Sequence, residues 1–166
     1  MEILEIKDLE TLAKKRVPKM FFDYVNSGSW TETTYNENVS DFQKIKLRQR
    51  VAIDMSNRTL ETKMINQPVS MPVAIAPTGL TGMQRADGEI LAAQAAEEFG
   101  IPYTLSTMSV CSIEAVAEKT KKPFWFQLYV MKDKKFMERL IDRAKEAKCS
   151  ALVLTCLLYT SPSPRD

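Results

Sequence analysis

Four short apolar runs in the second half of the sequence each end in small or polar residues that can contact a planar ligand. The four ends are Ala76-Pro77-Thr78-Gly79, Ser106-Thr107, Gln127 with Tyr129, and Thr155. Hydroxyl and amide groups donate and accept neutral hydrogen bonds, but they provide neither strong metal ligands nor a nucleophile paired with a base. A bound organic cofactor would therefore have to supply the chemistry, and the protein would orient that cofactor.

Each of these residues also has a purely structural interpretation. Pro77 and Gly79 are common turn residues, and Ser106 with Thr107 could cap a helix or belong to an ordinary loop. A buried Gln127 needs hydrogen-bond partners whether or not a ligand is present. Each signal alone is weak, and the recurrence of polar groups at four successive ends is what favours a ligand site.

The elements that would position these groups alternate between short strands and amphipathic helices. Strands are expected at 73–76, 103–105, 124–129 and 151–154. Helices are expected at 87–99, capped by Asp87 and closed by Gly100, then from a Ser112 cap to about Lys119, and after a cap at Asp133. Such alternation is typical of βα units that form a parallel sheet. The spacing of roughly 22–30 residues is a little below the ~31 per unit of a TIM barrel. We therefore expect an α/β fold, the N-terminal half of a TIM (β/α)8 barrel with about four βα units.

A doubly wound open sheet is the competing architecture for the same alternation of strands and helices. The sequence has no Gly-x-Gly-x-x-Gly after its first expected strand, which counts against a dinucleotide-binding domain of that type.

The N-terminal residues are expected to form helices that precede the barrel. Apolar residues recur at helical spacing from Leu9 to Val17. Pro18 can open a second helix, which Gly28 is expected to end. Residues 31–42 predict a third, polar helix, and the alternating apolar and basic residues 44–50 predict a half-exposed strand.

Composition argues against several classes of function. The chain has 166 residues, a net charge of +2 and no histidine, so we expect one domain with no nucleic-acid partner. Cys111, Cys149 and Cys156 are scattered, which indicates a reducing compartment and no metal site. No apolar run approaches the ~20 residues of a membrane span, and no signal peptide is visible. We expect a cytoplasmic location.

The motifs, taken in order, resemble the FMN-dependent 2-hydroxy-acid oxidase and dehydrogenase family. The matching segments are Ile75 to Leu80, Leu105 to Thr107, Trp125 to Tyr129, Leu154-Thr155 and the opening segment Lys19 to Gly28. The resemblance covers residues 1–155, and with Ser109 to Glu114 it is closest to the bacterial L-lactate dehydrogenase branch.

The resemblance implies FMN at the carboxyl ends of the barrel strands and oxidation of an L-2-hydroxy acid, with L-lactate expected, to the 2-oxo acid. The backbone of Ala76-Pro77-Thr78-Gly79 would lie against the flavin near N5. Ser106, Gln127 and Thr155 would hydrogen-bond the flavin ring or the ribityl chain.

Three further residues are implied in substrate binding. Tyr24 would bind the substrate carboxylate, and Tyr129, the implied catalytic residue, would contact the substrate near its hydroxyl or carboxylate. Met108 stands where the glycolate-specific branch has tryptophan, and the additional room favours lactate over glycolate, although a core-filling methionine is an equal alternative.

The parent enzyme implied by the resemblance would need an electron acceptor, for which quinone, oxygen and a cytochrome stay open. We expect that enzyme to be a homo-oligomer, with peripheral attachment to the inner membrane as an option.

The resemblance stops after Thr155. The family has an aspartate where this chain has Leu157, and we interpret residues 156–166 as an artefactual tail. The family's catalytic histidine, its substrate-binding arginine and its flavin-stabilising lysine would lie in the missing half. Because this chain has no histidine, we expect it to be inactive alone and to hold flavin loosely at best.

Other functions stay open beside this one. They are a glycolate or other 2-hydroxy-acid oxidase, a flavin or phosphate barrel related to isopentenyl-diphosphate isomerase, and a non-catalytic half barrel that binds a partner such as a second copy of itself. Tyr24 and Tyr129 distinguish a 2-hydroxy-acid oxidase from the isomerase-related barrel, because they imply a substrate carboxylate.

Overall fold

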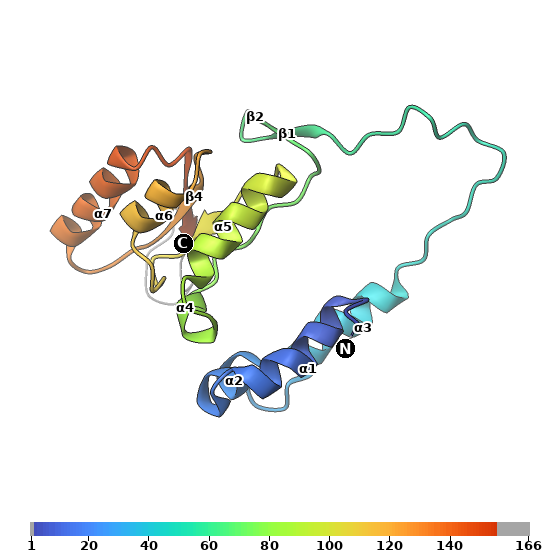
Figure 1. The fold of residues 1–166 in the computed structure, drawn as a ribbon, viewed down its shortest axis with the longest axis horizontal. Helices are drawn as coiled ribbons and strands as arrows, with labels where there is room; N and C mark the ends of the chain where they lie inside the picture. The colour runs from blue at the N-terminus through green and yellow to red at the C-terminus, as the bar shows by residue number, and fades with distance from the viewer. Residues whose placement is uncertain (1, 156–166) are drawn as a thin grey trace, which may run out of the picture. The chain divides into compact units, whose positions relative to one another are not determined.

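The computed structural model describes residues 2–155, which divide into two units between Thr59 and Leu60 (Figure 1). The expectation that residues 156–166 are an artefactual tail concerns residues outside the described part, and it stays a prediction. Among residues 2–155, no helix is both long enough and apolar enough to cross a membrane.

The first unit is helical, as the sequence predicts. It contains α1 (Ile6–Arg16), α2 (Lys19–Val25) and α3 (Thr33–Lys44). At the start of α1, the Asp8 carboxylate accepts hydrogen bonds from the backbone N–H groups of Leu4 (2.8 Å) and Glu5 (3.1 Å). Pro18 immediately precedes α2, where its missing N–H group costs no helical hydrogen bond. Local capping and proline signals therefore account for both helix starts.

Gly28 does not end α2, so that prediction is wrong. The helix is closed by Asn26, whose backbone N–H donates to the carbonyl of Phe22 at 3.0 Å. A Cβ atom at Gly28 would lie 2.7 Å from the Cβ of Tyr35 in α3, so the absence of a side chain is what the position requires. The glycine serves close packing, and the sequence pattern alone does not separate that role from helix capping.

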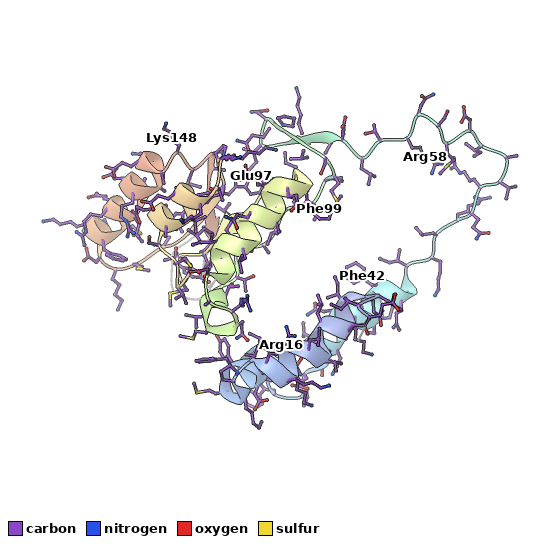
Figure 2. The ribbon with its side chains drawn as sticks, viewed as in Figure 1. Arg16, Phe42, Arg58, Glu97, Phe99 and Lys148 are labelled. Carbon is purple, nitrogen blue, oxygen red and sulfur yellow. The ribbon has the colours of Figure 1, made fainter. Side chains whose placement is uncertain are left out.

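The strand expected at 44–50 is also absent. Lys44 ends α3, residues 45–50 are all exposed, and the sheets of the described residues contain no partner for them. Figure 2 shows the side chains along the stretch from α3 to the next strand, which has no helix or strand and includes Arg58. Alternating apolar and basic residues form a stable strand only where other strands pair with them.

The second unit contains a parallel sheet whose strands lie in chain order, β3-β4-β5. The strands are β3 (Thr104–Leu105), β4 (Trp125–Tyr129) and β5 (Ala151–Thr155). The expected strand at 73–76 is reduced to a single parallel bridge between Ile75 and Tyr103. Pro72 and Pro77 flank this run and lack the N–H groups that would extend the pairing. The described residues thus show three parallel strands and one bridge, where four strands were expected.

Helices follow the bridge, β3 and β4, and three of the four were predicted. They are α4 (Thr81–Gln84), α5 (Gly88–Phe99), α6 (Ile113–Lys119) and α7 (Lys134–Glu146). The Ser112 hydroxyl accepts a hydrogen bond from Ala115 N (3.1 Å), and the Asp133 carboxylate accepts one from Phe136 N (3.0 Å). Gly100 closes α5 in the left-handed region, at φ 72°. The predicted caps of α6 and α7 and the glycine closing α5 are confirmed.

Three details of this unit differ from the expectation or were not anticipated. Asp87 stands at the start of α5 with φ 58°, and its side chain makes no capping bond. The short helix α4 was not predicted. An antiparallel hairpin of β1 (Thr62–Met64) and β2 (Gln67–Val69) was also missed, because its strands are short and Pro68 lies inside one of them.

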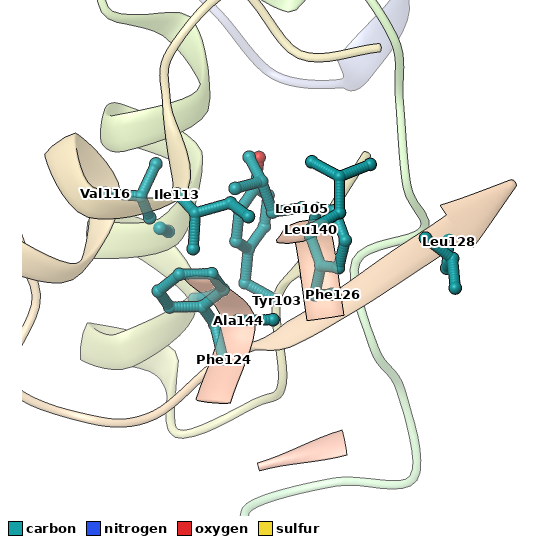
Figure 3. Packing of buried hydrophobic residues seen from close by; sticks show 11 residues of the cluster. Tyr103, Leu105, Ile113, Val116, Phe124, Phe126, Leu128, Leu140 and Ala144 are labelled. Atoms are coloured by element: carbon teal, nitrogen blue, oxygen red, sulfur yellow. The ribbon is translucent and has the colours of Figure 1, made fainter. Parts of the chain in front are cut away.

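The core of the second unit lies between the sheet and its helices. β4 alternates, with Phe126 and Leu128 in the apolar cluster and Gln127 on the other face. Figure 3 shows Phe126 beside Leu105 and Leu140 in this cluster. One face of the sheet is therefore used for packing, and the other is left for polar groups at the strand ends.

Candidate functional site

The carboxyl ends of the three parallel strands meet at one buried amide. The Gln127 side chain is 1% exposed, and its Oε1 accepts hydrogen bonds from the Ser106 hydroxyl and the Thr107 backbone N–H, each at 3.2 Å. Its Nε2 donates to the Thr155 hydroxyl oxygen at 2.6 Å. The structure therefore brings together Ser106, Gln127 and Thr155, which the sequence analysis selected from three separate strand ends.

These bonds fix which way the amide of Gln127 presents its donors. Its oxygen already accepts two hydrogen bonds, which identifies the other terminal atom as the nitrogen. An amide nitrogen carries two hydrogens, and one of them is used by Thr155. The second has no partner among residues 2–155 and is available to a ligand that offers an acceptor. The Thr155 oxygen accepts from Gln127, so its own hydrogen can also be donated.

Thr107 connects the loop after β3 to the end of β4. Its hydroxyl donates to the carbonyl oxygen of Gln127 at 2.5 Å, and the N–H of Tyr129 donates back to that hydroxyl at 3.3 Å. The loop also folds onto itself, because the N–H of Met108 donates to the Ser106 hydroxyl at 3.1 Å. The site is consequently held by a continuous set of neutral hydrogen bonds.

The loop after the first bridge lies against this set. Leu80 N donates to the carbonyl oxygen of Met108 at 2.9 Å. A Cβ atom on Gly79 would lie 3.3 Å from the Cβ of Met108 and 3.9 Å from Oγ of Ser106. Ala76 and Thr78 are exposed, whereas Pro77 and Gly79 are partly buried. Gly79 is thus beside Met108 and Ser106.

The three expected substrate residues are placed differently from one another. Tyr129 ends β4 on the same face as Gln127, because alternate residues of a strand point the same way. Met108 is 51% exposed in the loop after β3. Tyr24 belongs to α2 of the first unit and is 69% exposed, and its role stays a prediction.

The described thiols provide no nucleophile. Burial raises the pKa of Cys149 to about 11. Burial, followed by a hydrogen bond to Glu89, also raises the pKa of Cys111. Both thiols are therefore protonated at neutral pH, and the thiolate is the reactive form. The neutral donor set fits an organic cofactor with a polar ring edge.

Glu89 is a buried residue near the site that the sequence analysis missed. It is 0% exposed in the first turn of α5, on the same helical face as the buried Ala93 and Ala96. A charged residue at helical spacing with buried alanines was the signal that could have revealed it.

A cavity of about 280 Å³ lies elsewhere in the second unit, beside Pro102 and Pro123 at the amino ends of β3 and β4. None of the predicted site residues lines it. The strand-end hydrogen bonds are the candidate site, because a cofactor needs the directed donors that converge there.

Comparison with known proteins gives consistent findings. Residues 13–159 match the family described as FMN-dependent dehydrogenase. An L-lactate dehydrogenase of Acinetobacter baylyi is 50% identical over 155 residues, which are 93% of this chain and 40% of that protein. One of Acinetobacter baumannii is 52% identical over 148 residues, covering 89% of this chain and 39% of that protein. The chain therefore spans about two fifths of the length of these relatives.

Solved structures of similar proteins share the fold. An active mutant of (S)-mandelate dehydrogenase superposes with a TM-score of 0.87 at 35% identity, over 92% of this chain and 43% of that one. A structure described as the monotopic membrane protein (S)-mandelate dehydrogenase gives 0.87 at 34% identity, over 93% and 41%. A mandelate oxidase gives 0.82 at 32% identity, over 89% and 43%.

Proposed function

Because this chain belongs to the FMN-dependent dehydrogenase family, we propose that it supplies the flavin-binding part of an enzyme that oxidises an L-2-hydroxy acid to the 2-oxo acid. The observation that carries the proposal is the buried Gln127, which joins three strand ends and keeps one N–H for a ligand. The solved relatives support a barrel of which this chain forms the N-terminal part, although here the first strand is a single bridge.

Each residue of the network has a distinct task in this proposal. Ser106 and Thr107 fix the orientation of the Gln127 amide, so that its remaining N–H can donate to an acceptor on the flavin ring. Thr155 can donate its hydroxyl hydrogen to a second acceptor. The segment from Ala76 to Gly79 presents backbone and little side chain, which allows a flat ring to approach closely. When bound, FMN supplies the capacity to accept a hydride equivalent from the substrate.

The substrate contacts are proposed from the residues at the edge of this network. Tyr129 follows Gln127 on the same face and would contact the substrate near its hydroxyl or carboxylate. Met108 is half exposed and flexible, which leaves room for the methyl group of lactate. Tyr24 would bind the substrate carboxylate. The curated relatives named L-lactate dehydrogenase support lactate ahead of glycolate.

We propose that the chain alone does not turn over lactate. A base must take the hydroxyl proton of the substrate, and this sequence has no histidine. Of the described residues near Gln127, the side chains are hydroxyls, an amide, a thioether and a phenol. A complete enzyme would need the base and an electron acceptor, such as a quinone, oxygen or a cytochrome. A relative described as a monotopic membrane protein supports peripheral membrane attachment of that enzyme.

Titration of the 166-residue chain with FMN tests the proposal. We expect the chain to perturb the flavin absorption spectrum saturably, and Gln127→Met, which has a similar length and no amide, to weaken the affinity at least about tenfold. Tyr129→Phe is the control, because the phenol hydroxyl is proposed to contact substrate and should leave FMN affinity within about threefold. A wild-type chain that leaves the flavin spectrum unchanged would contradict the proposal.

A further inference from the structure

A single buried carboxylate connects the two loops that carry site residues. Oε1 of Glu89 accepts hydrogen bonds from the backbone N–H of Gly82 at 3.0 Å and from the backbone N–H of Val110 at 2.9 Å. Gly82 follows the loop of Gly79, and Val110 follows Met108 in the loop after β3. Glu89 itself lies in the first turn of α5. One side-chain oxygen therefore bridges two segments that come from different βα units.

The carboxylate stays ionised although it is fully buried. Burial alone would raise the pKa of Glu89, but the N–H groups of Val110 and Gly82, helped by the Cys111 thiol, stabilise the charged form and lower it. Oε2 has no hydrogen-bond partner of ordinary geometry among the described residues. A buried charge is costly unless it is well bonded. The hydrogen bonds from Gly82 and Val110 offset that cost in the folded chain.

The two loops pack with little room to shift. A Cβ atom on Gly82 would lie 2.7 Å from the Cβ of Val110, which shows that the backbones approach as closely as a glycine allows. Leu80 has a left-handed φ of 56°, an unfavourable conformation for leucine that the surrounding bonds must enforce. Its N–H donates to the carbonyl oxygen of Met108 at 2.9 Å, so the two loops are also bonded directly to each other.

We propose that Glu89 is a positioning residue that fixes the loop of Gly79 against the loop of Met108. It thereby sets the shape of the flavin-facing wall, which consists of these two loops. The inference rests on the proposed function, because the wall matters only if flavin lies against it. Glu89 does not contact the site directly. It acts through the N–H groups of Gly82 and Val110, each of which is close in sequence to a residue of the wall.

Three variants of the full chain separate this role from general stability. Glu89→Gln keeps the length and one acceptor oxygen. Glu89→Met keeps the length and has no strong acceptor, so both N–H groups lose their partner. Val116→Ala removes part of a fully buried core side chain on α6 that bonds neither loop, and it serves as the control for lost stability.

Two measurements are made on each variant. NMR amide exchange at Gly82 and Val110, without FMN, reports whether the loops are held, and FMN titration reports whether the wall has its shape. For Glu89→Met we expect both amides to exchange at least about tenfold faster, and FMN to bind at least about tenfold more weakly, than in Val116→Ala. For Glu89→Gln we expect both values within about threefold of wild type.

The outcomes distinguish this inference from the proposed function. If Glu89→Met changes amide exchange no more than Val116→Ala does, Glu89 does not hold the loops and the inference fails. Faster exchange with unchanged FMN affinity overturns it as well, because the loops are then tied without shaping the site. If wild-type chain binds no FMN, the proposed function fails, and amide exchange alone decides whether Glu89 ties the two loops.

Discussion

The amide nitrogen of Gln127 donates to the hydroxyl oxygen of Thr155 at 2.6 Å, which ties the end of β4 to the end of β5. The amide oxygen already accepts hydrogen bonds from two donors, so the amide cannot turn over without losing them. In this orientation the nitrogen has Thr155 as its acceptor. This pair shows that the end of the last described strand is part of the site and not only of the sheet.

Replacing Thr155 with valine should destabilise the chain by about 1–3 kcal/mol, because a buried amide N–H loses its acceptor while the side-chain shape is kept. Thr155→Ser keeps the hydroxyl and should lose clearly less. Urea unfolding followed by circular dichroism measures both. Equal losses for valine and serine would show that the methyl group, and not the hydrogen bond, matters at this position.

Tryptophan fluorescence should report flavin binding through one residue. Trp125 is 7% exposed and precedes Gln127 on the same strand face, whereas Trp30 in the first unit is fully exposed. The flavin absorbs where tryptophan emits, so FMN should quench Trp125 by energy transfer. In Trp30→Phe, where Trp125 is the only tryptophan of the sequence, the quenching should persist and saturate. A Trp30→Phe chain whose fluorescence FMN leaves unchanged would contradict the proposed location of the flavin.

The ion pair between α6 and α7 should stabilise the chain in a pH-dependent way. Arg143 donates to both carboxylate oxygens of Glu114, at 2.7 and 2.8 Å. These hydrogen bonds lower the pKa of Glu114 from its ordinary 4.5 to about 2. A depressed pKa in the folded state means that the stabilisation is present above pH 4.5 and is lost as the pH falls toward 2.

Glu114→Gln is expected to cost less than ~1 kcal/mol at neutral pH, because the two side chains are 48% and 42% exposed and water screens their attraction. The difference from wild type should shrink as unfolding is measured at decreasing pH. Glu118→Gln, on the same helix and without an ion pair among the described residues, is the control. If the stability difference between Glu114→Gln and wild type stays constant down to about pH 2, the ionised carboxylate is not its cause.

Gly100→Ala should destabilise the second unit by about 1 kcal/mol, because alanine is strained in the left-handed conformation that closes α5. Space is not the obstacle, since the nearest atom to a new Cβ would be the Ser70 Cβ at 3.4 Å. Gly100→Asn should lose less, because asparagine tolerates positive φ. Thermal unfolding of the three proteins checks the order, and an asparagine variant as unstable as the alanine variant would contradict it.

Sequence reasoning succeeded where the signal was local. Ser112 and Asp133 each precede an amphipathic run by one residue, and each caps its helix as predicted. The meeting of Ser106, Gln127 and Thr155 was also predictable, because the carboxyl ends of parallel strands share one edge of a sheet.

The remaining features depend on contacts between distant segments. The close approach of Gly28 to Tyr35 cannot be inferred from the spacing of glycines. The orientation of the Gln127 amide follows from its partners, which only the folded chain brings together. Helical spacing could have indicated that Glu89 is buried, but only the folded chain shows that its partners are the backbone N–H groups of Gly82 and Val110.

The alternation of β4 also has a consequence for folding fidelity. If β4 slipped by one residue against its neighbours, every side chain of the strand would change face. Phe126 would then meet the hydroxyls of Ser106 and Thr155, and Gln127 would enter the apolar cluster with its amide unpaired. A misaligned sheet is therefore penalised on both faces, so the residues proposed to hold the flavin also select the correct register before any ligand binds.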